Sequence, residues 1–158
     1  MSTAFLPGSF DPPTNGHLAL IEKAAKLFQK LYIGVTDNPQ KKRSPLFPVD
    51  ERVLLIKALI AHLSHIEVIS FKGLTVDYAN KLGANCLIRG VRNGSDYESE
   101  ISMAFANRIL GKMETCILPT EPTTIHISST LVREILAAKG PLEAFLPKQV
   151  ISAIINLS

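Results

Sequence analysis

Short apolar runs alternate with longer amphipathic segments along almost the whole chain, and this alternation restricts the fold more than any other feature of the sequence. Short apolar runs bounded by polar residues are typical of strands in a parallel sheet, and segments with a 3.6-residue apolar period are typical of the helices that cover it. The candidate strands are Thr3–Leu6, Leu31–Thr36, Glu67–Ser70, Cys86–Ile88 and Thr115–Leu118. The candidate helices are Leu18–Gln29, Asp50–Leu63, Thr75–Leu82, Asp96–Leu110, Ser129–Ala138 and Lys148–Asn156.

This order of elements predicts an α/β fold: a doubly wound, Rossmann-like, five-stranded parallel sheet with helices on both faces. The chain has 158 residues, of which 46% are hydrophobic, and this suits one compact domain over residues 1–158. Ligands of such folds bind at the carboxyl ends of the strands. Polar segments follow four of the candidate strands, and we expect them to meet at that edge: Gly8–His17, Asn38–Arg43, Arg89–Arg92 and Thr120–Thr130.

The first of these segments places a glycine-rich turn at the start of a helix. Backbone N–H groups are unpaired there and the helix dipole is positive, so the site attracts phosphate. Its glycine spacing matches neither a P-loop nor a dinucleotide-binding fingerprint. His17 lies where it could donate a hydrogen bond to a phosphoryl oxygen, and Ser9 and Thr14 could hold other oxygens of the same phosphate.

Basic residues follow two other strands. Lys41 and Arg89, with Lys42 and Arg92 as further candidates, would supply the fixed positive charge that phosphoryl or nucleotidyl transfer requires. Arg89 directly follows an apolar run, where a charge is costly unless an anion or a carboxylate meets it. The residues alone leave plainer interpretations open, namely a solvated basic loop, a helix-start histidine, and acidic residues that only favour a helix N-terminus. Ser95–Glu98 resembles a capping box, so we expect a helix to start near Ser95 with the serine as its cap.

The composition of the chain restricts the kinds of molecule that it is expected to bind. A net charge of +3, 6% aromatic residues and no tryptophan argue against an RNA-binding module, which needs a broad basic surface with exposed aromatic rings. Neither a signal sequence nor a run of about 18 apolar residues is present, so we expect no membrane partner and a cytoplasmic location. Cys86 and Cys116 lie in apolar runs and are expected to be reduced core residues. No cluster of residues has the spacing of a structural metal site.

The motifs together resemble the bacterial phosphopantetheine adenylyltransferase family, within the nucleotidyltransferases that carry a Thr/His-x-Gly-His signature. Here the signature is Thr14-Asn15-Gly16-His17, and ordered similarities span nearly the whole chain. They comprise Pro7–Pro12, Asn38–Lys42, Asp50–Arg52, Leu87–Arg92, Asp96–Glu100, Ile127–Arg133 and Phe145–Pro147. The chain departs from many relatives in having serine at position 9 instead of threonine, and in lacking a tryptophan between Thr120 and His126.

The resemblance implies that the adenylyl group of ATP is transferred to 4′-phosphopantetheine with Mg²⁺, giving dephospho-coenzyme A and pyrophosphate. It also implies direct in-line attack without a covalent enzyme intermediate, and catalytic roles for His17, Lys41 and Arg89. The implied contacts with the acceptor, 4′-phosphopantetheine, are Ser9, Lys41, Leu74 and Arg89. The implied contacts with ATP are Ser9, Phe10, His17, Gly90, Arg92, Glu100, Ile127, Ser128, Ser129 and Thr130.

The same resemblance implies a homohexamer and coenzyme A as a feedback inhibitor, while the direct metal ligands stay unknown. Two rival functions remain at this stage. One is a nucleotidyltransferase that uses nicotinamide mononucleotide as acceptor or a cytidylyl donor. The other is a nucleotide-binding sensor that binds ATP without turnover.

Overall fold

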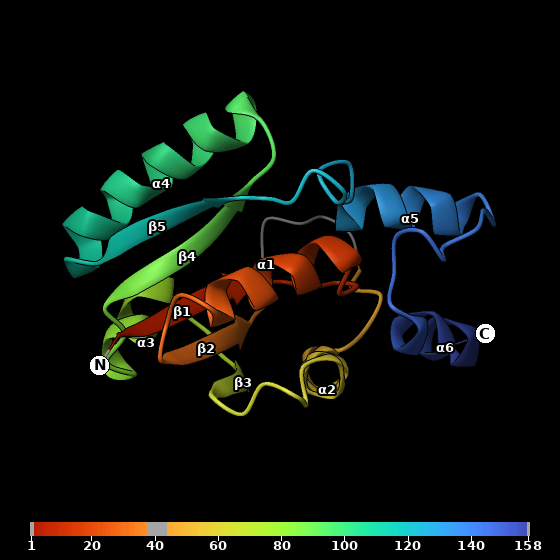
Figure 1. Cartoon of the computed structure of the whole chain (residues 1–158), viewed down its shortest axis with the longest axis horizontal. Coiled ribbons are helices and arrows are strands. Elements are labelled where there is room, and N and C mark those ends of the chain that lie inside the picture. Colours follow the sequence, from red (N-terminus) through yellow and green to blue (C-terminus); the bar gives the residue numbers. More distant parts are fainter. Residues whose placement is uncertain (1, 38–43, 158) are drawn as a thin grey trace.

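Five parallel strands in the order β3-β2-β1-β4-β5 form the centre of the computed structural model, which describes residues 2–37 and 44–157 (Figure 1). The strands are β1 (Thr3–Gly8), β2 (Lys30–Val35), β3 (Ile66–Ser70), β4 (Cys86–Val91) and β5 (Glu114–Pro119). The helices are α1 (Asn15–Ala25), α2 (Val49–Leu59), α3 (Thr75–Lys81), α4 (Gly94–Gly111), α5 (Ser129–Ala137) and α6 (Lys148–Asn156). The doubly wound α/β fold is therefore confirmed.

The sheet is covered on both faces because successive side chains of a strand point to opposite sides. Leu6 on β1 faces a core that includes Ile21 of α1 and Ile56 of α2. Phe5, one residue earlier, faces a second core that includes Val76 of α3. The side chains of all these residues are almost completely buried.

A third core lies beyond the carboxyl ends of the strands, where α6 lies beside α2 and side chains of α5 join the same cluster (Figure 1). Its buried side chains include Phe47, Val132 of α5 and Val150 of α6. This cluster fixes α5 past the edge of the sheet, and the N-terminus of α5 therefore comes close to the segment that follows β1.

Several element boundaries differ by a few residues from those expected from the sequence. β4 continues to Val91, because β5 runs beside it as far as Pro119 and keeps the ladder of hydrogen bonds intact. Arg89 therefore lies inside a strand. α1 spans Asn15–Ala25 instead of Leu18–Gln29, and α2 ends at Leu59 instead of Leu63. α4 begins at Gly94, close to the expected start near Ser95.

Cys86 is buried and Cys116 is half-buried on the neighbouring strand. Both are free thiols, as expected, although their Sγ atoms lie 3.4 Å apart. Burial is the main cause that raises the pKa of Cys86 to about 12, so its thiol stays protonated near neutral pH.

In the described part of the chain, none of the helices combines the length and the apolar character that crossing a membrane requires.

Candidate active site

A cleft of about 350 Å³ opens at the carboxyl ends of β1 and β4. The strand order reverses between these two strands, and this is where doubly wound folds bind their ligands. Three of the four polar segments expected at this edge contribute to the cleft. The site residues expected from the sequence that line it are Ser9, Phe10, His17, Arg89, Gly90, Arg92, Glu100, Ile127, Ser128, Ser129 and Thr130.

His17 is fixed in the first turn of α1 by a reciprocal pair of hydrogen bonds with Thr14. The backbone N–H of His17 donates to Thr14 Oγ1 at 3.2 Å, and the backbone N–H of Thr14 donates to His17 Nδ1 at 3.0 Å. This is a capping box with histidine in the position usually held by glutamate. Because Nδ1 accepts a hydrogen bond, the neutral imidazole carries its proton on Nε2. The ring also packs edge-on against Phe10, with 4.9 Å between the ring centroids.

The guanidinium of Arg89 forms an ion pair with a carboxylate on α4. Its Nε and Nη2 each donate to an oxygen of Glu100 at 2.8 Å, and Nη1 donates to the carbonyl of Pro7 at 3.2 Å. The side chain of Arg89 is 37% exposed and lines the cleft, whereas the side chain of Glu100 is more deeply buried. The expectation that a charge at this point needs a partner is confirmed, and the partner belongs to the same chain.

Arg92 is oriented in a similar way by Asp96, a cleft residue that sequence reasoning treated only as a helix-start acid. The carboxylate of Asp96 accepts hydrogen bonds from Nε of Arg92 at 2.9 Å and from its backbone N–H at 3.1 Å. The side-chain hydrogen bond from Arg92 is the main cause that lowers the pKa of Asp96. The four-residue spacing of the two opposite charges gave only a weak sequence signal, because Arg92 lies before the N-cap of α4 and not on the helix.

The expected cap of α4 was wrong. The Oδ1 atom of Asn93 accepts the backbone N–H of Asp96 at 2.9 Å, and Asn93 is the N-cap in place of Ser95. Asparagine caps helices as well as serine does, so Asn93 is a suitable cap two residues before the expected one.

The N-terminus of α5 forms the opposite side of the cleft. Ser128 is its N-cap, and the hydroxyl of Ser128 accepts the backbone N–H of Leu131 at 3.1 Å. The hydroxyl of Ser129 donates to the carbonyl of Pro12 at 3.0 Å. The first turn of α5 is therefore tied to the segment that leads from β1 into α1.

Two predicted site residues lie elsewhere. Lys41, with the rest of residues 38–43, lies outside the described residues. Leu74 is exposed at the N-cap of α3 and does not belong to the described lining of the cleft. The roles of both residues stay predictions.

Sequence reasoning also missed cleft residues in the segment after β5. Thr120 and Thr124 line the cleft, and the buried Oγ1 of Thr120 has no hydrogen-bond partner among residues 2–37 and 44–157. A lone threonine in a polar loop gives no signal in one sequence, because nothing local distinguishes it from other loop residues.

Residues 5–135 match the family model described as cytidylyltransferase-like. The curated phosphopantetheine adenylyltransferase of Heliobacterium modesticaldum is 40% identical over 96% of this chain and 90% of its own length. Phosphopantetheine adenylyltransferases from two serotypes of Actinobacillus pleuropneumoniae are also 40% identical, over 96% of both chains. The chain belongs to the phosphopantetheine adenylyltransferase family. As a member of that family it is an enzyme of the nucleotidyltransferase type, and the resemblance noted in the sequence is confirmed.

A solved structure from Vibrio parahaemolyticus, assigned as a nicotinate-nucleotide adenylyltransferase, is similar over 98% of this chain and 99% of its own. The TM-score is 0.67 and the sequence identity is 17%. This likeness independently supports the Rossmann-like fold of the phosphopantetheine adenylyltransferase family member described here.

Proposed function

We propose that this enzyme transfers the adenylyl group of ATP to 4′-phosphopantetheine, giving dephospho-coenzyme A and pyrophosphate. The observation that carries the proposal is that one cleft joins His17, the guanidinium groups of Arg89 and Arg92, and the N-terminus of α5. Two phosphate-bearing substrates need donors on several sides, and these elements supply them from β1, β4, α1 and α5. Family membership supports the choice of substrates.

In the proposed reaction an oxygen of the acceptor phosphate attacks the α-phosphorus of ATP in line. A new P–O bond forms, the bond from the α-phosphorus to the bridging oxygen breaks, and its electron pair leaves with pyrophosphate. The attacking oxygen is already an anion near neutral pH, so the chain needs neither a nucleophilic side chain nor a general base. Positioning and charge stabilisation then account for catalysis.

His17 is proposed to stabilise the charge that develops at the α-phosphate. Its Nε2 proton follows from the bond that Nδ1 accepts from Thr14, and this bond also fixes the plane of the ring. Ser9 and Phe10 are proposed to contact ATP through the turn before α1, and Ser9 also contacts the acceptor phosphate.

Arg89 is proposed to orient the acceptor phosphate together with Lys41, and Leu74 is proposed to contact the pantetheine arm. Glu100 supports this role of Arg89, because a bidentate carboxylate holds the guanidinium in one plane while part of it faces the cleft. The remaining proposed ATP contacts are Gly90, Arg92, Glu100, Ile127, Ser128, Ser129 and Thr130.

The residues of the cleft fit a Mg²⁺ ion that arrives with the triphosphate. No group of three potential metal ligands occurs among the described residues, and the cleft carboxylates Asp96 and Glu100 are both bonded to arginines. We therefore propose that phosphate oxygens and water hold the ion and that the protein supplies no cage. Bound Mg²⁺ adds positive charge beside the leaving pyrophosphate.

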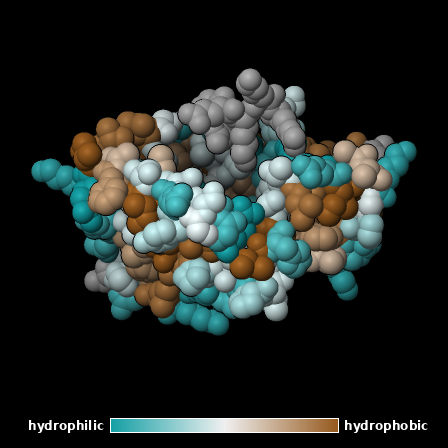
Figure 2. Space-filling model, turned by 90° about the horizontal axis from the view of Figure 1, so that it is seen from above, coloured by the Kyte–Doolittle hydropathy of each residue, from teal (hydrophilic) through white to brown (hydrophobic). Residues whose placement is uncertain are grey.

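Three further properties belong to the proposal: a homohexamer, feedback inhibition by coenzyme A and a cytoplasmic location. Exposed apolar side chains on α4 support self-association, namely Met103, Phe105, Ile109 and Leu110. Figure 2 shows apolar surface gathered toward the two ends of the molecule, with more polar surface between them. Coenzyme A contains both a pantetheine arm and an adenosine group, so one molecule would occupy both substrate sites.

Pyrophosphate release tests the proposal directly. ATP and CTP are each combined with 4′-phosphopantetheine, nicotinamide mononucleotide and glycerol phosphate. We expect release only with ATP and 4′-phosphopantetheine. Turnover with another pair would assign a different nucleotidyltransferase activity, and ATP binding without turnover in any pair would indicate a sensor.

A further inference from the structure

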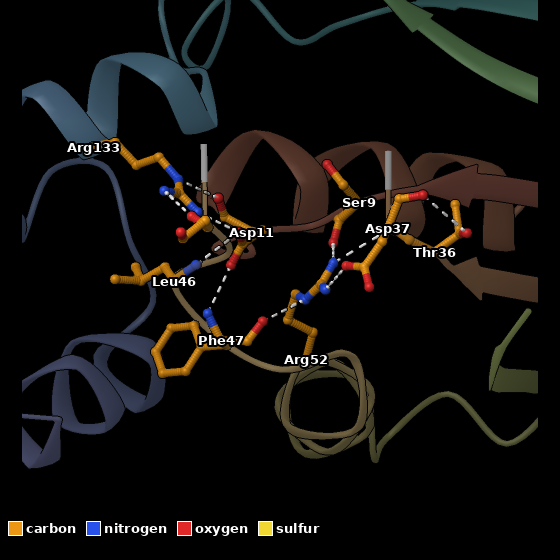
Figure 3. Close-up of polar contacts among 9 residues, drawn as sticks. Ser9, Asp11, Thr36, Asp37, Leu46, Phe47, Arg52 and Arg133 are labelled. Carbon is orange, nitrogen blue, oxygen red and sulfur yellow. Dashed lines mark hydrogen bonds and ion pairs between the residues drawn. The ribbon is translucent and has the colours of Figure 1, made fainter. Parts of the chain in front are cut away.

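Side chains that are not part of the described lining of the cleft form hydrogen bonds to the turn from Ser9 to Thr14 (Figure 3). Arg133 approaches the turn from α5, and Arg52 approaches it from α2. Asp11 lies between them, and its side chain is 9% exposed. A carboxylate this deeply buried requires several partners.

Asp11 has those partners on both oxygens. Oδ1 accepts the backbone N–H of Phe47 at 3.0 Å, and Oδ2 accepts the backbone N–H of Leu46 at 2.9 Å. Oδ2 also forms an ion pair with Nη2 of Arg133. The carboxylate thus joins the turn, the segment before α2 and the helix α5.

Arg133 uses each nitrogen of its guanidinium. Besides the ion pair, Nε donates to the backbone carbonyl of Asp11 at 3.1 Å and Nη1 donates to the carbonyl of Ser44 at 3.2 Å. The planar fork of arginine permits these bonds together, whereas a lysine has one nitrogen from which to donate.

Arg133 also acts together with Ser129. The two residues are four positions apart and therefore lie on the same side of α5. Ser129 donates to the carbonyl of Pro12, and Arg133 donates to the carbonyl of Asp11. Two successive turns of α5 thus hold two successive residues of the turn that leads to His17.

We propose that Asp11 and Arg133 are positioning residues whose ion pair fixes the separation between the N-terminus of α1, which carries His17, and the N-terminus of α5, which carries Ser128. This inference rests on the proposed function, in which ATP contacts both helix starts. Neither residue belongs to the described lining of the cleft, so their effect on ATP passes through the backbone they hold. Arg89, a proposed contact of the acceptor substrate, lies on β4 and is not among the residues that the Asp11–Arg133 pair joins.

The experiment compares Arg133→Met, which keeps the volume but loses the charge and every donor, with Asp11→Asn and with the double variant. Arg133→Lys keeps the charge but not the fork. Val76→Ala is the matched control, because Val76 is buried in the core on the other face of the sheet. For each variant, kcat and the KM for each substrate are measured by pyrophosphate release, well below the Tm of that variant, and the Kd for ATP alone is measured by calorimetry.

We expect Arg133→Met to raise the KM and Kd for ATP about tenfold and to lower kcat about ten- to a hundredfold, because small misplacements of reacting groups have effects of that size. The KM for the acceptor substrate should change less than the KM for ATP, because Arg89 lies on β4 although Ser9 lies in the turn itself. Arg133→Lys should fall between wild type and Arg133→Met. The double variant should be no worse than the less active single variant, as residues acting as one unit are not additive.

A purely structural role predicts another pattern: Arg133→Met would lower the Tm, as Val76→Ala does, and leave kcat and both constants for ATP within about twofold of wild type. That result would overturn the proposal. If Arg133→Met does not fold, Arg133→Lys and Asp11→Asn give the same comparison. If the wild-type enzyme releases no pyrophosphate, the proposed function fails, and the Kd for ATP in the variants still decides whether the pair positions the nucleotide site.

Discussion

Replacing His17 by asparagine and by alanine separates the roles of its two ring nitrogens. The Oδ1 atom of an asparagine can accept the backbone N–H of Thr14 in place of Nδ1, but its side chain is too short to put a donor where Nε2 lies. Alanine removes both nitrogens. The bond from the backbone N–H of residue 17 to Thr14 Oγ1 survives in both variants, because its donor is a main-chain group.

The structure sets the size of each effect. The Thr14 N–H to Nδ1 bond is 3.0 Å long and half of a capping box, so His17→Ala should lower the free energy of unfolding by about 1 kcal/mol. His17→Asn should stay within about 0.5 kcal/mol of wild type. If Nε2 stabilises the transition state, both variants lose about 3–5 kcal/mol of that stabilisation, which is roughly a hundred- to several-thousandfold in kcat.

Urea unfolding measures the first effect, and pyrophosphate release at saturating concentrations of both substrates measures the second. A His17→Asn enzyme that keeps kcat within about tenfold of wild type would refute the proposed role of Nε2. A His17→Ala enzyme as stable as wild type would show that the capping bond carries no net stability. The two outcomes are independent, because one concerns folding and the other turnover.

Three further changes test other parts of the structure. Arg52→Met should lower the free energy of unfolding by about 3–5 kcal/mol in urea titrations, because the buried guanidinium donates at 2.9 and 2.6 Å to two backbone carbonyls that would lose their donors. Gly34→Ala should cost about 1–3 kcal/mol in the same assay, because its Cβ would lie 2.2 Å from Cζ of Phe5. Asp96→Asn should remove a pH-dependent part of the stability. The hydrogen bond from Arg92 lowers the pKa of Asp96 in the folded state. The stabilisation is therefore complete above about pH 4 and is lost as the pH falls through the lowered pKa. Urea unfolding of wild type and Asp96→Asn at about pH 6 and about pH 3 should show a larger difference in the free energy of unfolding at the higher pH.

The changes at Arg52 and Gly34 each have a matched control. Asp37→Ala removes the carboxylate partner of Arg52, but the side chain of Asp37 is 62% exposed, so the loss should stay below about 1 kcal/mol. An equal loss in both variants would mean that the ion pair, and not the bonds to the carbonyls, stabilises the fold. Gly94→Ala is the control for Gly34, because a Cβ there would meet no described atom within 4 Å. A stability difference for Asp96→Asn that does not change with pH would contradict the proposed link to Arg92.

The sequence predicted the sheet and its helices because local periodicity reports which side of an element is buried. Phe5 and Leu6 illustrate this, since adjacent apolar residues in a short run already require a strand covered on both faces. The same reasoning placed His17 and Arg89 at one edge of the sheet, and the cleft confirms that they meet there.

Element ends and ionic partners could not be predicted in the same way. Asn93 and Ser95 are equally good cap residues, and only the structure shows that Asn93 accepts the backbone N–H of Asp96. Asp11 and Arg133 are 122 positions apart, and no periodicity relates residues at such a distance. Their pairing exists because the third core holds α5 beyond the carboxyl edge of the sheet.

The sequence by itself determined the order of strands and helices, the family and the chemical groups available at the edge of the sheet, because these follow from local patterns and motifs. Only the tertiary structure decided which groups face one another. The structure shows ion pairs of Glu100 with Arg89, of Asp96 with Arg92 and of Asp11 with Arg133. The physical reason is that a charge removed from water is costly unless an opposite charge and hydrogen-bond partners are in place, and the path of the folded backbone sets which partners come within reach.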